Sequence, residues 1–132
     1  MQYQTKELNI VVHSNNIMEL TATETSKGIL TLEEVENNLA AFKQATNGKT
    51  MAALLNISGS YTKKEVLKKY SNLDYGIIAT ALVANSFTSK FIGNIFLAMV
   101  QRFSEDMNNP TKIFTDKETA VEWLLMHLEK AK

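Results

Sequence analysis

Residues 77–100 read IIATALVANSFTSKFIGNIFLAMV, and this stretch decides the fold. Its first part, 77–84, is apolar apart from one threonine, which is typical of a strand buried on both faces of a sheet. A short turn rich in hydroxyl side chains follows, and the apolar spacing beyond it predicts a helix over 87–103. A buried strand that leads through a turn into a helix is typical of α/β proteins, which bind ligands at such junctions.

The same alternation of strands and helices continues on both sides of this stretch. Two further apolar runs, 51–57 and 111–114, are predicted to be strands. Helical apolar spacing predicts a helix over about 32–46, another that ends near residue 72, and a last one that ends near residue 130. Each of these three helices is preceded by a threonine with a glutamate three residues later, which predicts a capping box. These pairs are Thr31 with Glu34, Thr62 with Glu65, and Thr115 with Glu118.

The N-terminal part has a different pattern. Residues 8–12 alternate between apolar and polar side chains, Asn15 and Asn16 supply a turn, and 17–20 resume the apolar pattern, which predicts an antiparallel hairpin. We therefore predict a single α/β domain over residues 1–132. It would have a mostly parallel central sheet, the N-terminal antiparallel hairpin and four helices, in the order ββαβαβαβα.

Composition excludes several classes of function. The 132 residues include 14 Lys plus Arg and 14 Asp plus Glu, so no net charge attracts the chain to nucleic acid. Cysteine is absent, which excludes thiol catalysis, disulfides and thiolate-bound zinc. The first residues lack a secretory pattern and Lys90 interrupts the longest apolar run, so we expect a cytoplasmic protein without stable membrane insertion.

The sequence gives no sign of catalytic chemistry. It contains no glycine-rich phosphate loop and no nucleophile elbow. Neither His13 nor His127 has a second ligand at a spacing typical of metal sites. We therefore expect no catalytic residue, no metal and no cofactor.

The turn before the predicted helix 87–103 is the strongest candidate for a ligand site. The first turn of a helix has free backbone N–H groups and a partial positive charge, so it could hold the anionic head of a small amphipathic or lipid-like molecule. The side chains available there are Ser86, Thr88, Ser89 and Lys90. Alternatively, Asn85 or Ser86 caps the helix and the nearby aromatic side chains fill the core.

The same helix has more apolar positions than one face can hold. Burial of a large apolar side chain is worth about 1.5–3 kcal/mol, so a surplus favours a covering partner. A homodimer is the simplest cover, because one self-complementary patch suffices, and another protein or a ligand is the alternative. The predicted interaction surface consists of Phe91, Ile92, Ile95, Phe96, Met99 and Phe103.

Three segments give the chain a family resemblance. They are TLEEVENNLAAFKQATNGKTMAALLNISG at 31–59, IIATALVANSFTSKFIGNIFLAM at 77–99 and PTKIFTDKETAVEWL at 110–124. With these segments the chain resembles the STAS-like superfamily, which comprises anti-sigma-factor-antagonist-like domains related in fold to CRAL-TRIO lipid-binding domains. The likeness is greatest to a branch of small bacterial proteins of unassigned function. It implies a non-enzymatic regulatory or protein-interaction domain.

The resemblance also implies a possible phosphosite. In the antagonists a phosphorylated serine begins the helix after a parallel strand, in an Asp-Ser-Ser-Gly-like setting. Here Ser58 and Ser60 occupy that turn, but Asn56 and Ile57 precede them and no aspartate is present. A structural role, in which a serine hydroxyl caps the following helix, is the interpretation that we favour.

Overall fold

The computed structural model describes six strands and two α-helices. The described residues are 1–26, 29–56, 65–66, 69, 76–84, 86 and 110–131.

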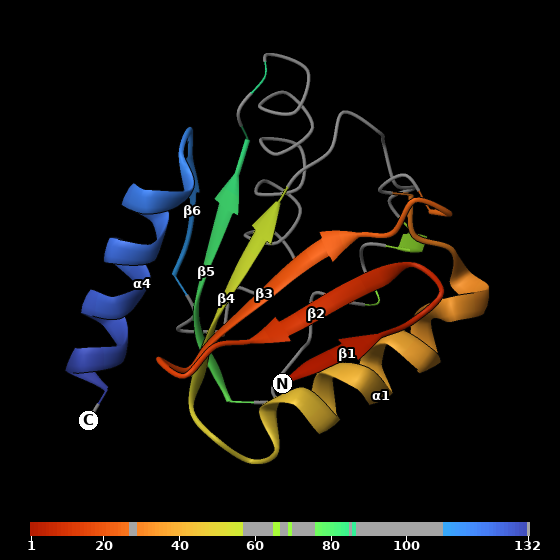
Figure 1. Ribbon diagram of the computed structural model, residues 1–132, viewed down its shortest axis with the longest axis horizontal. Helices are drawn as coiled ribbons and strands as arrows, with labels where there is room; N and C mark the ends of the chain where they lie inside the picture. The colour runs from red at the N-terminus through yellow and green to blue at the C-terminus, as the bar shows by residue number, and fades with distance from the viewer. Residues whose placement is uncertain are drawn as a thin grey trace.

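A six-stranded mixed sheet forms the centre of the protein (Figure 1). The strands lie side by side in their order along the chain, from β1 to β6. The pairs β1–β2 and β2–β3 are antiparallel, whereas β3 to β6 are parallel to one another. The α/β class and the hairpin beside the parallel strands are thereby confirmed. The strands are β1 Gln2–Gln4, β2 Leu8–Val12, β3 Ile17–Ala22, β4 Met51–Asn56, β5 Ile77–Val83 and β6 Thr111–Phe114.

Strand β1 is an addition to the predicted order. It pairs with β2 in the register Tyr3 to Ile10, and it turns the predicted hairpin into three antiparallel strands. Its sequence, Gln-Tyr-Gln, has a single apolar side chain, so it carries almost no strand signal. Tyr3 packs against the apolar cluster between the sheet and the helix that follows β3. This contact explains why so short a segment pairs with β2.

The two described helices, α1 and α4, cover opposite faces of the sheet. Helix α1, Val35–Thr46, follows the 3₁₀ helix Leu32–Glu34 and packs against a cluster that includes Ile10 and Met18. Helix α4, Lys117–Lys130, packs against a cluster that includes Ile17 and Leu54. Because successive residues of a strand point to opposite faces, adjacent positions such as Ile17 and Met18 belong to different clusters.

The prediction of four helices is matched only in part. The described part of the chain contains two α-helices, and the helices predicted to end near residue 72 and to span 87–103 lie largely outside it. Within the first of these segments, Glu65, Val66 and Lys69 are described and are helical. Val66 is buried and the other two residues are exposed, as expected for a helix with one apolar and one polar face.

Neither capping box that can be assessed forms as predicted. Thr31 precedes the 3₁₀ helix, but its side chain does not cap it, and Glu34 instead accepts a hydrogen bond from Asn37. Helix α4 is capped by Asp116, one residue after the predicted Thr115, because the Asp116 carboxylate accepts the Thr119 N–H at 2.8 Å. This hydrogen bond, with that of the Thr119 hydroxyl, lowers the pKa of Asp116.

The side chain of Thr31, which is exposed, instead belongs to a polar network around the buried Glu7, which is 4% exposed. The Thr31 hydroxyl and N–H donate to Glu7 Oε2 at 2.8 and 3.0 Å, and Asn38 Nδ2 donates to Oε1 at 3.0 Å. Thr5 Oγ1 then donates to Asn38 Oδ1 at 2.6 Å. The network joins the turn after β1, the entrance to α1 and α1 itself.

Neither helix in the described part of the chain combines the length and the apolar character that a membrane crossing requires.

We expect Glu7→Ala to lower the free energy of unfolding by about 2–4 kcal/mol, because it removes the acceptor of the Thr31 hydroxyl and N–H and an acceptor of the buried Asn38 amide. Glu7→Gln keeps one acceptor oxygen and should lose less. The exposed Glu24 provides the control, since Glu24→Ala should change stability by no more than about 0.5 kcal/mol. Urea unfolding measures all three, and equal stability of Glu7→Ala and Glu24→Ala would contradict the structural role of Glu7.

Candidate functional site

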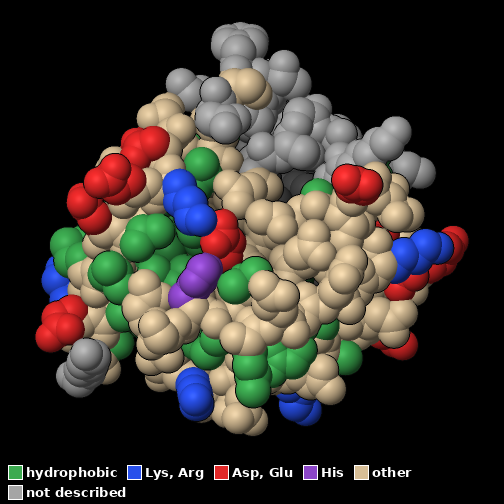
Figure 2. Space-filling view, viewed as in Figure 1, with side chains coloured by type: hydrophobic (Ala, Val, Ile, Leu, Met, Phe, Trp, Pro, Cys, Tyr) green, Lys and Arg blue, Asp and Glu red, His purple; other side chains and the backbone are tan. Residues whose placement is uncertain are grey.

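The face of the sheet opposite α1 carries a group of charged and polar side chains between the antiparallel strands and α4. Glu19 of β3 lies two positions beyond Ile17, which packs beneath α4, so its side chain points to that same face. His13 follows β2 and lies diagonally across from Glu19, because Val11 is the partner of Glu19 in the register. Figure 2 shows acidic, basic and histidine side chains adjoining one another on this face.

Glu19 is the centre of the group, and we call it with its three partners the Glu19 cluster. His13 Nε2 lies 2.9 Å from Glu19 Oε1, and Lys117 Nζ lies 3.0 Å from Glu19 Oε2. Asn56 Nδ2, at the end of β4, donates to Oε2 at 3.5 Å. The partners therefore come from the β2–β3 turn, from β4 and from the first turn of α4.

Burial and hydrogen bonding act in opposite directions on the pKa of Glu19. Its side chain is only 12% exposed, and this burial raises the pKa by disfavouring the charged carboxylate. The hydrogen bonds from His13 and Lys117, with the positive charge of Lys117, favour the carboxylate and outweigh burial, so the pKa is lowered overall. Glu19 is accordingly ionised at neutral pH.

This arrangement suits anchoring better than proton transfer. A carboxylate whose pKa is lowered by its partners is a weaker base than an unpaired one. The Glu19 carboxylate also connects β3 to Lys117, which lies 98 residues away in the sequence. The Glu19 cluster therefore holds the start of α4 against the antiparallel strands.

The second histidine lies apart from this cluster on α4. His127 packs edge-on against Trp123, with their ring centroids 4.5 Å apart, and Trp123 in turn lies 5.4 Å from Phe114. Within the described ranges, no group of three or more acidic or histidine side chains could hold a metal ion.

Of the residues that the sequence proposes for a site, only Ser86 is described. It is exposed and lies just beyond the carboxyl end of β5. The remaining candidates lie outside the described residues. They are Thr88, Ser89 and Lys90 of the ligand site, Phe91, Ile92, Ile95, Phe96, Met99 and Phe103 of the interaction surface, and the serines Ser58 and Ser60.

The Glu19 cluster was not predicted from the sequence. The alternation of side chains in the hairpin could have placed His13 and Glu19 on one face of the sheet. They are separated by an even number of residues along the chain, and alternate residues of a strand point to the same face. No sequence signal connects this face to Lys117 or Asn56, because their approach depends on how α4 packs on the sheet.

A mixed six-stranded sheet with helices on opposite faces defines an α/β protein. The chain belongs to the family described as "Domain of unknown function (DUF7793)", whose model matches residues 10–128. The matched region includes all four residues of the Glu19 cluster. No curated protein matches the chain, and neither does any solved structure.

We expect Glu19→Gln to lower the free energy of unfolding at pH 7 by about 0.5–1 kcal/mol, a small value because water screens the half-exposed Lys117 and His13. The lowered pKa means that the carboxylate stabilises the fold fully above its unfolded pKa of about 4.3. This contribution is lost as the pH falls through the pKa of the folded state. The difference between Glu19→Gln and the wild type should therefore disappear in acid.

Glu122→Gln is the matched control for this variant, because Glu122 is exposed on the same helix that carries Lys117. Urea unfolding of both variants at several pH values gives the comparison. A Glu19→Gln protein as stable as the Glu122→Gln protein at pH 7 would show that the Glu19 cluster does not stabilise the fold.

Proposed function

We propose that this chain is a non-enzymatic, STAS-like regulatory or protein-interaction domain that forms a homodimer in the bacterial cytoplasm. The parallel strands β3 to β6 and the positions of α1 and α4 are compatible with such a domain. In this proposal the two further helices precede β5 and β6, which gives the order ββαβαβαβα after the added strand β1.

The observation that carries the proposal is the apolar content of residues 91–103. This stretch has eight large apolar side chains in thirteen positions, and they occur on more than one face of a helix. Only one face of a helix can pack on its own sheet. A second copy of the chain would cover the remainder with the same surface, which is the simplest closed arrangement.

The described charged groups support a role without catalysis. Glu19 is paired with Lys117 and His13, and Asp116 caps α4. Both described groups whose pKa is shifted therefore stabilise the fold through partners within the chain. In catalytic sites, by contrast, groups with shifted pKa values converge on a space for substrate.

We expect the purified protein to sediment as a dimer at micromolar concentration. A photo-crosslinking amino acid at position 96 should join two copies covalently under ultraviolet light, because it lies in the proposed interface. Position 32 is the control, since Leu32 is 55% exposed on the 3₁₀ helix and outside that interface. Analytical ultracentrifugation and denaturing gels measure the two results.

A monomer at every concentration would contradict the dimer. A dimer that crosslinks from position 32 but not from position 96 would retain the oligomer and contradict the proposed surface. Neither measurement requires a variant that might fail to fold.

A second candidate function rests on the position of Ser86. Its exposed side chain lies just beyond the carboxyl end of β5, where α/β proteins commonly bind ligands. An amphipathic or lipid-like anion could bind there with Ser86, Thr88, Ser89 and Lys90 around its head group. Native mass spectrometry of the same preparation distinguishes the two functions, because a monomer that retains a small anionic molecule would favour this one.

A further inference from the structure

The turn that connects α1 to β4 contains the only Asn-Gly pair of the sequence, Asn47 and Gly48. Asn47 caps the C-terminus of α1 in the left-handed conformation, with φ of 47° and ψ of 41°, and Gly48 also has a positive φ, of 74°. The Lys49 N–H donates to the Thr46 carbonyl oxygen at 2.8 Å and closes the turn. Asparagine followed by glycine is favoured where both central residues of a turn have positive φ.

Two groups of this turn, the side-chain amide of Asn47 and the backbone nitrogen of Gly48, are accessible to solvent and to each other's approach. Both residues are exposed. Apart from the chain neighbours of Gly48, no described atom lies within 4 Å of the position that a Cβ would take there. Neither the Asn47 amide nor the Gly48 N–H forms a hydrogen bond with another described residue. The described structure therefore neither shields nor holds these two groups.

We propose that Asn47 is a site of spontaneous deamidation. The Gly48 backbone nitrogen loses its proton to solvent and attacks Asn47 Cγ. A C–N bond forms in a five-membered succinimide ring, and the side-chain nitrogen leaves as ammonia, which takes its additional proton from solvent. Water then opens the ring at either of its two carbonyl groups, so the products are aspartate and isoaspartate. Glycine favours the first step because no side chain obstructs the approach of its nitrogen.

The folded turn slows this reaction without preventing it. At ψ of 41° the Gly48 nitrogen lies on the opposite side of the Cα–C bond from Asn47 Cβ, so it does not reach Cγ. The peptide between the two residues must first rotate, and this rotation breaks the hydrogen bond from Lys49 to Thr46. The net contribution of one such hydrogen bond corresponds to a factor of about two to ten in rate. The unfolded chain should therefore react faster by about that factor.

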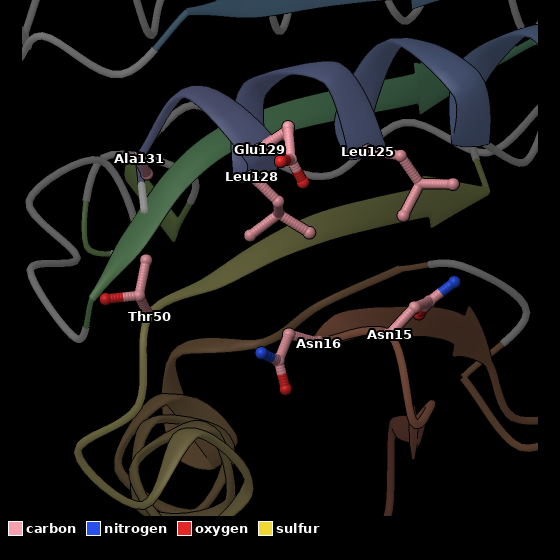
Figure 3. A pocket seen from close by; sticks show the side chains of 7 residues that line it. All are labelled: Asn15, Asn16, Thr50, Leu125, Leu128, Glu129 and Ala131. Atoms are coloured by element: carbon pink, nitrogen blue, oxygen red, sulfur yellow. The ribbon is translucent and has the colours of Figure 1, made fainter.

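Asn16 provides a comparison within the same chain. It is exposed, has a positive φ of 67° and lies at the edge of the surface hollow beside α4 (Figure 3). The residue after it, however, is the β-branched Ile17, which is 1% exposed and whose N–H donates to Asn15 Oδ1 at 3.2 Å. The attacking nitrogen at this position is thus both hindered and held. Asn16 should therefore persist where Asn47 reacts.

Deamidation changes the end of α1 just before the central strand. Aspartate at position 47 adds a negative charge where the helix dipole already contributes a partial negative charge. Isoaspartate instead lengthens the backbone of the turn by one methylene group, four residues before β4 begins at Met51. Both products weaken the connection between α1 and β4. Because the reaction requires only water, the modified fraction increases with the age of the molecule, whatever the function of the chain.

The test is incubation of the purified full chain at neutral pH and physiological temperature, followed by peptide mass mapping with fragmentation. Asn47 should convert to a mixture of aspartate and isoaspartate, whereas Asn16 should stay intact. In urea the conversion of Asn47 should be faster by about two- to tenfold, because the hydrogen bond that closes the turn is then absent. Equal rates in the folded and unfolded protein would overturn the restraint by the turn.

Gly48→Asn is the matched variant, because asparagine tolerates the positive φ of this position but adds a side chain beside the attacking nitrogen. Circular dichroism verifies that the variant is folded. Its Asn47 should show no conversion over the period in which the wild type converts, and persistent conversion would overturn the role of Gly48. The proposal itself is overturned if Asn47 of the wild type stays intact, or if Asn16 converts as readily.

Discussion

Strand β4 is buried on both of its faces, and the placement of both described helices depends on this burial. Met51 belongs to the cluster beneath α1, whereas Ala52 and Leu54 belong to the cluster beneath α4. All three side chains are at most 2% exposed. A shift of β4 by one residue would exchange the two sets of side chains, so both helices would lose their apolar contacts together.

The sequence predicts this core well because two-sided burial leaves a clear pattern. Residues 51–57 and 77–84 are nearly continuous apolar runs, and the structure places β4 and β5 there. Strand β1 was missed, since Tyr3 alone carries its apolar signal. The two capping predictions that fall on described residues were wrong because other side chains nearby make the hydrogen bonds: the Thr31 hydroxyl donates to Glu7, and Asp116 rather than Thr115 caps α4 by accepting the Thr119 N–H.

The described polar sites were harder to predict than the core. Glu19 and Lys117 meet only because α4 crosses the sheet at that point, and a partner 98 residues away leaves no local pattern. Local periodicity identifies which face of an element is buried, but the meeting of two elements depends on tertiary packing.

Native-state hydrogen exchange tests the two-sided burial of β4 most directly. We expect the amides of Ala53, Leu54 and Leu55 to exchange only when the whole protein unfolds, so their free energy of exchange should equal the global free energy of unfolding. The amides of the edge strand β1 should exchange through smaller openings, at a lower free energy. If the amides of β4 exchange as readily as those of β1, the central strand is not what holds the two helices in place.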